Sequence, residues 1–259
     1  MSHIWERASL PESDVSKRGM DGALLVSGDT TTLVLWDIDG TLLETAGEGK
    51  RAFYATLETM FPGRAWPDID MAGRTDFGIW HELAAAGGLA DPPPFSDFGE
   101  RYGKVMAEFF AATPPTALMG ALELCRCIDE HPGFHNGLVT GNFFEGTRVK
   151  LQALGLWDLF TLDGQPVGGY GDHHPDKGPL ALHALEGWYR RYPDRKVKAV
   201  VVGDTPEDVR SAKVARIACL GVAPGRFSTT DLLECGADAA VQNLSDIDGI
   251  ISLLDRIAK

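Results

Sequence analysis

The sequence is poor in basic residues, and this shortage excludes two classes of partner. Lys and Arg number 24 against 37 Asp and Glu, which leaves a net charge of −13 at pH 7. Nucleic acids and anionic membranes both bind through a surplus of positive charge, so we expect neither as a partner. Aromatic residues make up 9% of the chain and do not alternate with basic ones, as they would on a surface that stacks nucleobases.

Cysteines, targeting segments and long apolar runs are also scarce. No apolar run approaches the length that a membrane crossing requires. Residues 1–29 are polar and lack a targeting core, so we expect a loosely attached extension, with a candidate edge strand at residues 23–26. Reduced cysteines in the cytoplasm are the default expectation. The four cysteines show no metal-site spacing beyond one Cys-x-Cys on an expected helix: Cys125, Cys127, Cys219 and Cys235.

What the sequence does contain is acidic residues placed directly after buried strands. Residues 32–36 form an apolar run typical of a parallel strand, and Asp37 and Asp39 follow it at once. In an open α/β sheet, ligands bind at the carboxyl ends of strands. We therefore expect Asp37 to face a pocket and Asp39 to fold over it from the loop. Taken alone, the motif is equally compatible with an ordinary turn that caps a helix.

A second apolar strand precedes Thr140, Gly141 and Asn142. A Thr hydroxyl and the backbone N–H groups that follow a strand can hold a phosphoryl oxygen without adding charge. The alternative is a strand-to-helix turn in which Thr140 or Asn142 is the helix N-cap. In either case, residues 143–155 are predicted to be helical.

A third strand, residues 199–202, ends just before Asp204, and Asp208 follows four residues later. Pro206 between them is typical of the first turn of a helix. An acid that ends a buried strand is costly unless it is paired or bound to a metal, which makes Asp204 a candidate ligand. Carboxylate and carbonyl oxygens suit the hard, octahedral ion Mg²⁺. The candidate metal ligands are Asp37, Asp39 through its backbone carbonyl, Asp204 and Asp208.

These segments, in this order, resemble the motifs of the haloacid dehalogenase-like hydrolase superfamily, in particular its phosphoglycolate phosphatase-like branch. The resemblance covers roughly residues 30–45 and 114–250. It implies an α/β fold, a doubly wound parallel sheet with a Rossmann-like core. We expect this core domain to comprise residues 30–45 and 114–259.

The superfamily also places a lysine between the second and third segments. Here the sequence at residues 171–180 leaves two candidates, because aligning Pro175 and Asp176 with the family pattern puts His174 at the usual lysine position. We favour Lys177, since the site needs a cation at any working pH and histidine titrates near neutrality.

The resemblance implies a role for each candidate residue. Asp37 would be the nucleophile that forms an aspartyl-phosphate. Asp39 would protonate the leaving oxygen and then take a proton from the attacking water. We expect clustered carboxylates to keep one acid protonated enough for this task. The phosphoryl oxygens would be held by Thr140, Gly141, Asn142 and Lys177.

Residues 46–113 interrupt the expected core and resemble the helical cap domain of this branch. Helices are predicted over residues 50–60, 79–86 and 98–112. A cap excludes water and brings specificity residues to an open pocket. The loop that contains Arg74 resembles the one that faces the catalytic centre in relatives, which implies that Arg74 would hold a substrate carboxylate or phosphate. A surface Arg paired with Asp76 is the alternative.

The expected function is therefore a Mg²⁺-dependent phosphatase that acts on a small phosphorylated metabolite in the cytoplasm. A phosphosugar mutase on the same scaffold and a non-catalytic binding protein are the alternatives. The sequence identifies neither the substrate nor the oligomeric state.

Overall fold

The computed structural model describes residues 30–259, so the predicted extension and its candidate strand lie outside the described residues. The main sheet has six parallel strands in the order β10-β9-β8-β1-β4-β7. The predicted α/β class with a parallel sheet is thereby confirmed. The strands are β1 (Thr31–Trp36), β4 (Phe134–Val139), β7 (Gly168–Gly169), β8 (Val197–Gly203), β9 (Ala218–Val222) and β10 (Ala239–Val241).

Helices cover both faces of this sheet because its central strand is apolar on both sides. Val34 and Trp36 of β1 pack into one hydrophobic cluster, and Leu33 and Leu35 pack into a second on the opposite face. The first cluster includes α4 (Ala121–Glu130) and α9 (Ile247–Ile257). The second includes α6 (Leu180–Arg191), α7 (Pro206–Ala215) and α8 (Thr229–Glu234).

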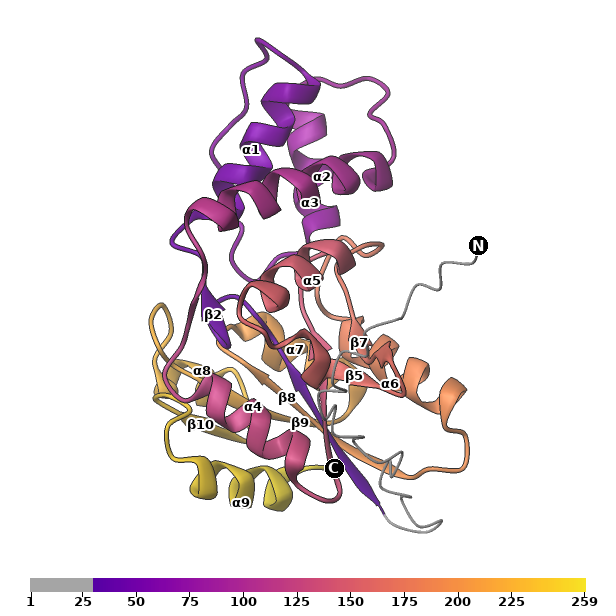
Figure 1. Cartoon of the computed structure of the whole chain (residues 1–259), viewed down its shortest axis with the longest axis vertical. Helices are drawn as coiled ribbons and strands as arrows, with labels where there is room; N and C mark the ends of the chain where they lie inside the picture. The colour runs from indigo at the N-terminus through magenta and orange to yellow at the C-terminus, as the bar shows by residue number, and fades with distance from the viewer. Residues whose placement is uncertain (1–29) are drawn as a thin grey trace, which may run out of the picture.

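Three helices form a separate unit at one end of the molecule (Figure 1). They are α1 (Glu48–Met60), α2 (Asp76–Ala86) and α3 (Phe95–Ala112). The unit has a hydrophobic cluster of its own, in which the Phe98 ring lies 4.5 Å from that of Phe53 and 4.6 Å from that of Trp80. Phe143, just before α5 (Phe144–Ala153), joins this cluster and so links the unit to the sheet domain.

Helices α1, α2 and α3 each begin two or three residues earlier than the sequence predicted. For α2 the cause is visible, because the Thr75 hydroxyl accepts a hydrogen bond from the Gly78 N–H and caps the helix. Two chain crossings join the helical unit to the sheet domain, and they pair as the antiparallel strands β2 (Leu43–Glu44) and β3 (Thr116–Ala117).

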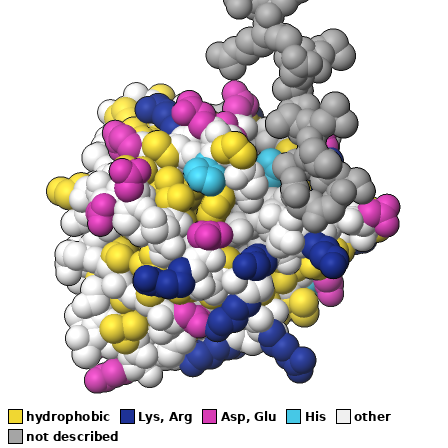
Figure 2. Space-filling model, turned by 90° about the horizontal axis from the view of Figure 1, so that it is seen from below, with side chains coloured by type: hydrophobic (Ala, Val, Ile, Leu, Met, Phe, Trp, Pro, Cys, Tyr) yellow, Lys and Arg dark blue, Asp and Glu magenta, His cyan; other side chains and the backbone are white. Residues whose placement is uncertain are grey.

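The sequence predicted none of the shortest elements. They are β2, β3, the hairpin β5 (Thr161–Leu162) and β6 (Gln165–Pro166), and the 3₁₀ helix η1 (Trp157–Phe160). The face opposite the helical unit carries charged side chains of both signs among hydrophobic ones (Figure 2). Over residues 30–259, every helix is too short or too polar to cross a lipid bilayer.

Candidate active site

The register of the sheet brings three strand ends to one place. Trp36 of β1 lies beside Leu138 of β4 and Val202 of β8. Asp37, the next residue, donates its backbone N–H to the Val202 carbonyl at 2.9 Å. The polar segments after these strands therefore emerge together at the carboxyl edge of the sheet, as the sequence predicted.

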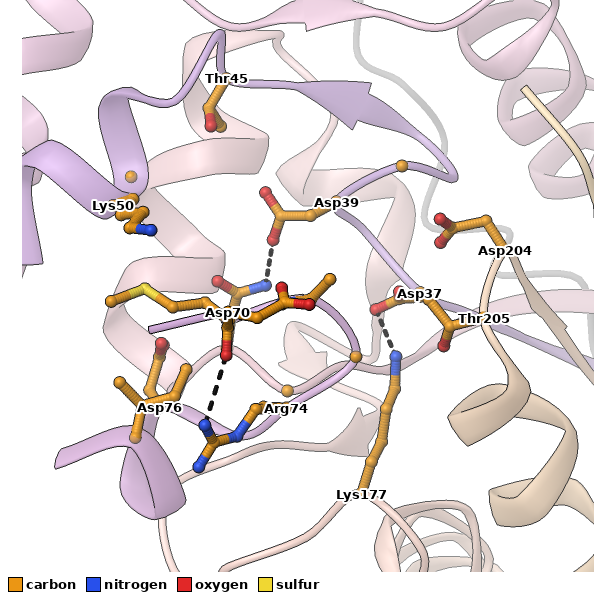
Figure 3. A pocket seen from close by; sticks show the side chains of 18 of the residues that line it. Asp37, Asp39, Thr45, Lys50, Asp70, Arg74, Asp76, Lys177, Asp204 and Thr205 are labelled. Atoms are coloured by element: carbon orange, nitrogen blue, oxygen red, sulfur yellow. Dashed lines mark hydrogen bonds and ion pairs between the residues drawn. The ribbon is translucent and has the colours of Figure 1, made fainter. Parts of the chain in front are cut away.

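A cavity of about 430 Å³ lies at this edge, between the strand ends and the helical unit (Figure 3). Its walls combine acidic and basic side chains from both parts of the chain. The charged residues that line it are Asp37, Asp39, Lys50, Asp70, Arg74, Asp76, Lys150, Lys177, Asp204 and Arg226.

Three acids come together beside this cavity, one just after β1, one just after β8 and one on α7. Asp37, Asp204 and Asp208 each present an oxygen within 4.8 Å of the others. The turn at Gly40 makes room for them: its φ is +80°, and a Cβ there would lie 2.4 Å from Asp204 Oδ2. Thr41 Oγ1 donates to Asp204 Oδ1 at 3.1 Å and fixes that carboxylate.

Burial, and to a smaller extent the neighbouring acids, raise the pKa values of two of these residues. Burial raises the pKa of Asp37 to about 7, and the Lys177 ammonium opposes this shift. Burial, and then the charge of Asp37, raise the pKa of Asp204 to about 8. Each carboxylate is therefore harder to ionise than it would be in water, and a bound cation would favour its ionised form.

Lys177 is the cation of this cluster. Its side chain is only 1% exposed, and its Nζ lies 2.7 Å from Asp37 Oδ1 and 2.6 Å from Asp208 Oδ1. These two carboxylates hold the pKa of Lys177 well above its usual range despite its burial. His174, the other candidate for this position, does not line the cavity. Its ring lies against that of His183 at a tilt of 47°, and its carbonyl accepts a hydrogen bond from Thr75 Oγ1.

Asp208 does not line the cavity but contacts Lys177, which does. It is fully buried, and its Oδ2 accepts hydrogen bonds from the Thr205 N–H at 3.0 Å and the Thr205 hydroxyl at 2.7 Å. These bonds form a capping box at the start of α7. Its other oxygen faces Lys177, so a metal ion would share that oxygen with the lysine.

Asp39 lies in a different environment from Asp37. Lys150 Nζ donates to both of its carboxylate oxygens, at 2.7 and 2.6 Å, and Asn142 Nδ2 donates to Oδ2 at 2.6 Å. Although its deep position favours the neutral form, Lys150 and Asn142 lower the pKa of Asp39 below its usual value. The expectation that clustered carboxylates keep an acid protonated is therefore wrong for Asp39, and the raised pKa values belong to Asp37 and Asp204.

Lys150 is the site residue that the sequence analysis missed. It lies on α5, its side chain is 4% exposed, and its third contact is with Asn142 Oδ1 at 2.6 Å. The sequence carried a weak signal, because Lys150 stands between the apolar residues Val149 and Leu151 of the predicted helix. A lysine on the buried face of a helix needs a partner, and the partner lies 111 residues away.

Of the four residues predicted to hold phosphate, the three that follow β4 differ in position. Gly141 and Asn142 line the cavity, whereas Thr140 is fully buried and is not among the lining residues. Thr140 Oγ1 accepts hydrogen bonds from both nitrogens of Asn142, at 3.2 and 2.8 Å. It therefore orients Asn142 from behind the cavity wall.

The start of α2 is docked on the loop of residues 140–143. The Asp76 N–H donates to the Gly141 carbonyl at 2.8 Å, and Asp76 Oδ2 accepts from the Phe143 N–H at 2.9 Å. Only glycine fits at position 141, since a Cβ there would lie 1.9 Å from the Arg74 carbonyl. Burial raises the pKa of Asp76 to about 7, with Lys150 opposing the shift.

Arg74 lines the cavity from the helical unit. Its guanidinium pairs with Glu82 and donates to the Asp70 carbonyl at 3.3 Å. The alternative pairing with Asp76 is wrong, because Asp76 is turned inward to the backbone of Phe143. Arg74 therefore keeps its place at the cavity wall through partners on its own helical unit.

The donor set fits a hard divalent cation. Three carboxylates supply oxygens within one small volume, and no nitrogen or sulfur ligand accompanies them in the cluster found among residues 30–259. Burial raises the pKa values of Asp37 and Asp204 and the neighbouring acids add to the shift, so a bound cation would favour their ionised forms.

Comparison with known proteins gives a consistent result. A family model described as haloacid dehalogenase-like hydrolase matches residues 31–216. The chain is 27% identical over 231 residues to the probable phosphatase IndB of Dickeya dadantii (strain 3937). The alignment covers 87% of this chain and 96% of that protein.

Solved structures share the fold. CbbY from Rhodobacter sphaeroides in complex with phosphate aligns with a TM-score of 0.60 at 20% identity, over 83% of this chain and 95% of that one. A predicted phosphoglycolate phosphatase from Haemophilus somnus 129PT aligns with a TM-score of 0.58 at 17% identity, over 85% of this chain and 98% of that one. At these identities the likeness shows the fold alone.

Proposed function

The chain belongs to the haloacid dehalogenase-like hydrolase family, as a hydrolase of the phosphatase kind, and on this premise we propose that it is a Mg²⁺-dependent phosphatase acting on a small phosphorylated metabolite. The family membership that the motifs suggested is confirmed. One observation supports the proposal most directly: the Asp37 carboxylate ends the central strand, lines the cavity, and has Lys177 at 2.7 Å and Asp204 beside it.

In the first proposed step, an Asp37 oxygen bonds to phosphorus as the bond from phosphorus to the ester oxygen breaks. Asp39 gives a proton to that departing oxygen in the small fraction of enzyme in which it is protonated, since Lys150 and Asn142 favour its ionised form. In the second step, a water oxygen bonds to phosphorus and passes its proton to Asp39. The bond from phosphorus to Asp37 breaks, which releases phosphate and restores the carboxylate.

The remaining residues would bind and orient the phosphoryl group. Lys177 and the backbone and amide groups of Gly141 and Asn142 present positive charge and donors toward the cavity. A Mg²⁺ ion would be held by Asp37 and Asp204, with the Asp39 carbonyl and Asp208 nearby. When bound, that ion would neutralise charge on the phosphoryl oxygens.

We propose that residues 46–113 act as the cap over a core of residues 30–45 and 114–259. Support comes from the separate hydrophobic cluster of α1, α2 and α3 and from the cavity that lies between this unit and the strand ends. Arg74 would then reach the substrate from the cap side. The cysteines, all free, agree with the reducing cytoplasm that we propose as the location.

The test is phosphate release from a panel of phosphorylated metabolites, with and without Mg²⁺. We expect turnover with Mg²⁺, its loss on chelation, and its recovery when Mg²⁺ is restored. Asp37→Asn should abolish turnover while the protein stays folded. Asp255→Asn, which changes an exposed acid of α9, is the matched control and should keep wild-type activity.

Two outcomes would redirect the proposal. A product that retains its phosphate in a new position would identify a phosphosugar mutase. Folded protein that binds Mg²⁺ but turns over no substrate would identify a binding protein.

A further inference from the structure

Lys150 is a buried cation whose contacts all belong to the cavity. Its three hydrogen bonds go to Asp39 Oδ1, Asp39 Oδ2 and Asn142 Oδ1, at 2.7, 2.6 and 2.6 Å. Its side chain is 4% exposed, whereas that of Asp39 is 43% exposed and opens into the cavity. The ammonium thus stands behind Asp39 and leaves the front of that carboxylate accessible.

This arrangement determines where the Asp39 carboxylate can be. A partly exposed Asp side chain is free to rotate, but donors at both oxygens define its position and its plane. Asn142 adds a further donor to Oδ2, and Thr140 orients Asn142 in turn. Burying a lysine for this purpose is costly unless its partners satisfy it, and here they supply three acceptors.

We propose that Lys150 is a positioning residue that holds Asp39 ready to take the proton of the water that hydrolyses the Asp37 phosphate. The inference rests on the proposed function and assigns Lys150 to its second step. In that step the water oxygen bonds to phosphorus, its proton goes to Asp39, and the electron pair of the breaking bond returns to Asp37.

The two steps of the reaction separate when the leaving group needs no proton. Nitrophenolate departs from phosphorus unprotonated, so formation of the Asp37 phosphate from p-nitrophenyl phosphate does not depend on Asp39 as an acid. Hydrolysis of that intermediate still needs a base for the water. A defect confined to the position of Asp39 must therefore slow only the second step.

The experiment is rapid mixing of the enzyme and Mg²⁺ with p-nitrophenyl phosphate, using Lys150→Met and Lys150→Gln. We expect Lys150→Met to release close to one equivalent of nitrophenol in a fast burst at the wild-type rate. Steady turnover should then be slower by roughly 10²-fold, the usual contribution of a positioned acid or base. Lys150→Gln, which keeps one donor, should be slowed less. Arg148→Gln, on the same helix and paired with Glu145, is the control and should match wild type.

Each other outcome is decisive. If both Lys150 variants, shown to be folded by circular dichroism, lose burst and steady turnover in equal proportion, Lys150 has only a structural role. Turnover at the wild-type rate would also overturn the inference. If the wild-type enzyme cleaves neither this ester nor any metabolite, the proposed function itself is overturned, together with this role of Lys150.

Discussion

Asp37 and Asp39 are one residue apart, yet the fold gives them opposite electrostatic surroundings. Asp37 is buried among other acids and its pKa is raised to about 7, whereas Lys150 and Asn142 hold the pKa of Asp39 below its usual value. Asp37 is thus the carboxylate that is harder to ionise, and Asp39 is the one whose partners favour its ionised form. This difference is set by partners distant in the sequence and not by the motif.

The buried Asp76 allows a test of how the burial of one carboxyl group changes the stability of the protein with pH. Burial raises its pKa in the folded protein to about 7, whereas an Asp in an unfolded chain has a pKa of about 3.9. Between about pH 4 and pH 7 the folded state therefore binds more protons than the unfolded state, and stability falls as pH rises through this window. At pH 8 the cost is fully present, at up to about 4 kcal/mol.

Asp76→Asn removes that charge while its side-chain oxygen can still accept from Phe143. We expect the variant to be more stable than wild type at pH 8 and to lose this advantage as pH falls toward 4. Urea denaturation of both proteins at several pH values gives the difference. An advantage that does not change with pH would show that Asp76 is not the titrating group.

Residues at strand ends were the predictable part of the site. Asp37, Asp204 and Asn142 each follow an apolar run, and a parallel sheet brings such positions to one edge. Lys150 was not predictable in the same way. Its position on a helix suggests a buried partner, but only the three-dimensional packing of α5 identifies Asp39 as that partner.

At the scale of elements, the contact between α2 and the loop of residues 140–143 depends on one glycine. A methyl group at Gly141 would lie 1.9 Å from the Arg74 carbonyl, and that oxygen belongs to backbone that cannot move aside alone. We expect Gly141→Ala to destabilise the protein by roughly 1–3 kcal/mol and to lower kcat/KM, because α2 must shift away from the cavity.

Gly187 in α6 is the matched control for this substitution. A Cβ at Gly187 would meet nothing within 4 Å. Gly187→Ala should therefore leave kcat/KM unchanged and stabilise the helix by roughly 0.5–1 kcal/mol. Urea denaturation and steady-state kinetics measure both effects. Equal behaviour of the two variants would contradict the tight docking of α2.

Elements with strong periodic signals were predicted well, and short ones were not. The strands β1 and β8 and the helix α5 match their predicted ranges within one or two residues. The pair β2 and β3 has two residues in each strand, which is too short to show a pattern. The early start of α2 depends on a cap by Thr75 that apolar spacing does not reveal.

At the scale of the whole molecule, the cavity depends on how the helical unit and the sheet domain are joined. Backbone hydrogen bonds from Asp76 and Phe77 to Gly141 and Gly171 hold one side. At the mouth of the cavity, Arg226 pairs with Asp70 at 2.7 Å, but both side chains are largely exposed. Exposed ion pairs of this kind contribute little stability, so the mouth is the weaker side of the closure.

The central claim is that Asp37 accepts the phosphoryl group, and mass spectrometry of the enzyme tests it most directly. The enzyme is quenched with acid during turnover of a phosphate ester with Mg²⁺, and its peptides are analysed. We predict the added mass of one phosphoryl group on the peptide that contains Asp37, and none in Asp37→Asn. Phosphate release by Asp37→Asn at the wild-type rate, or a phosphoryl group found on another residue instead, would contradict the claim.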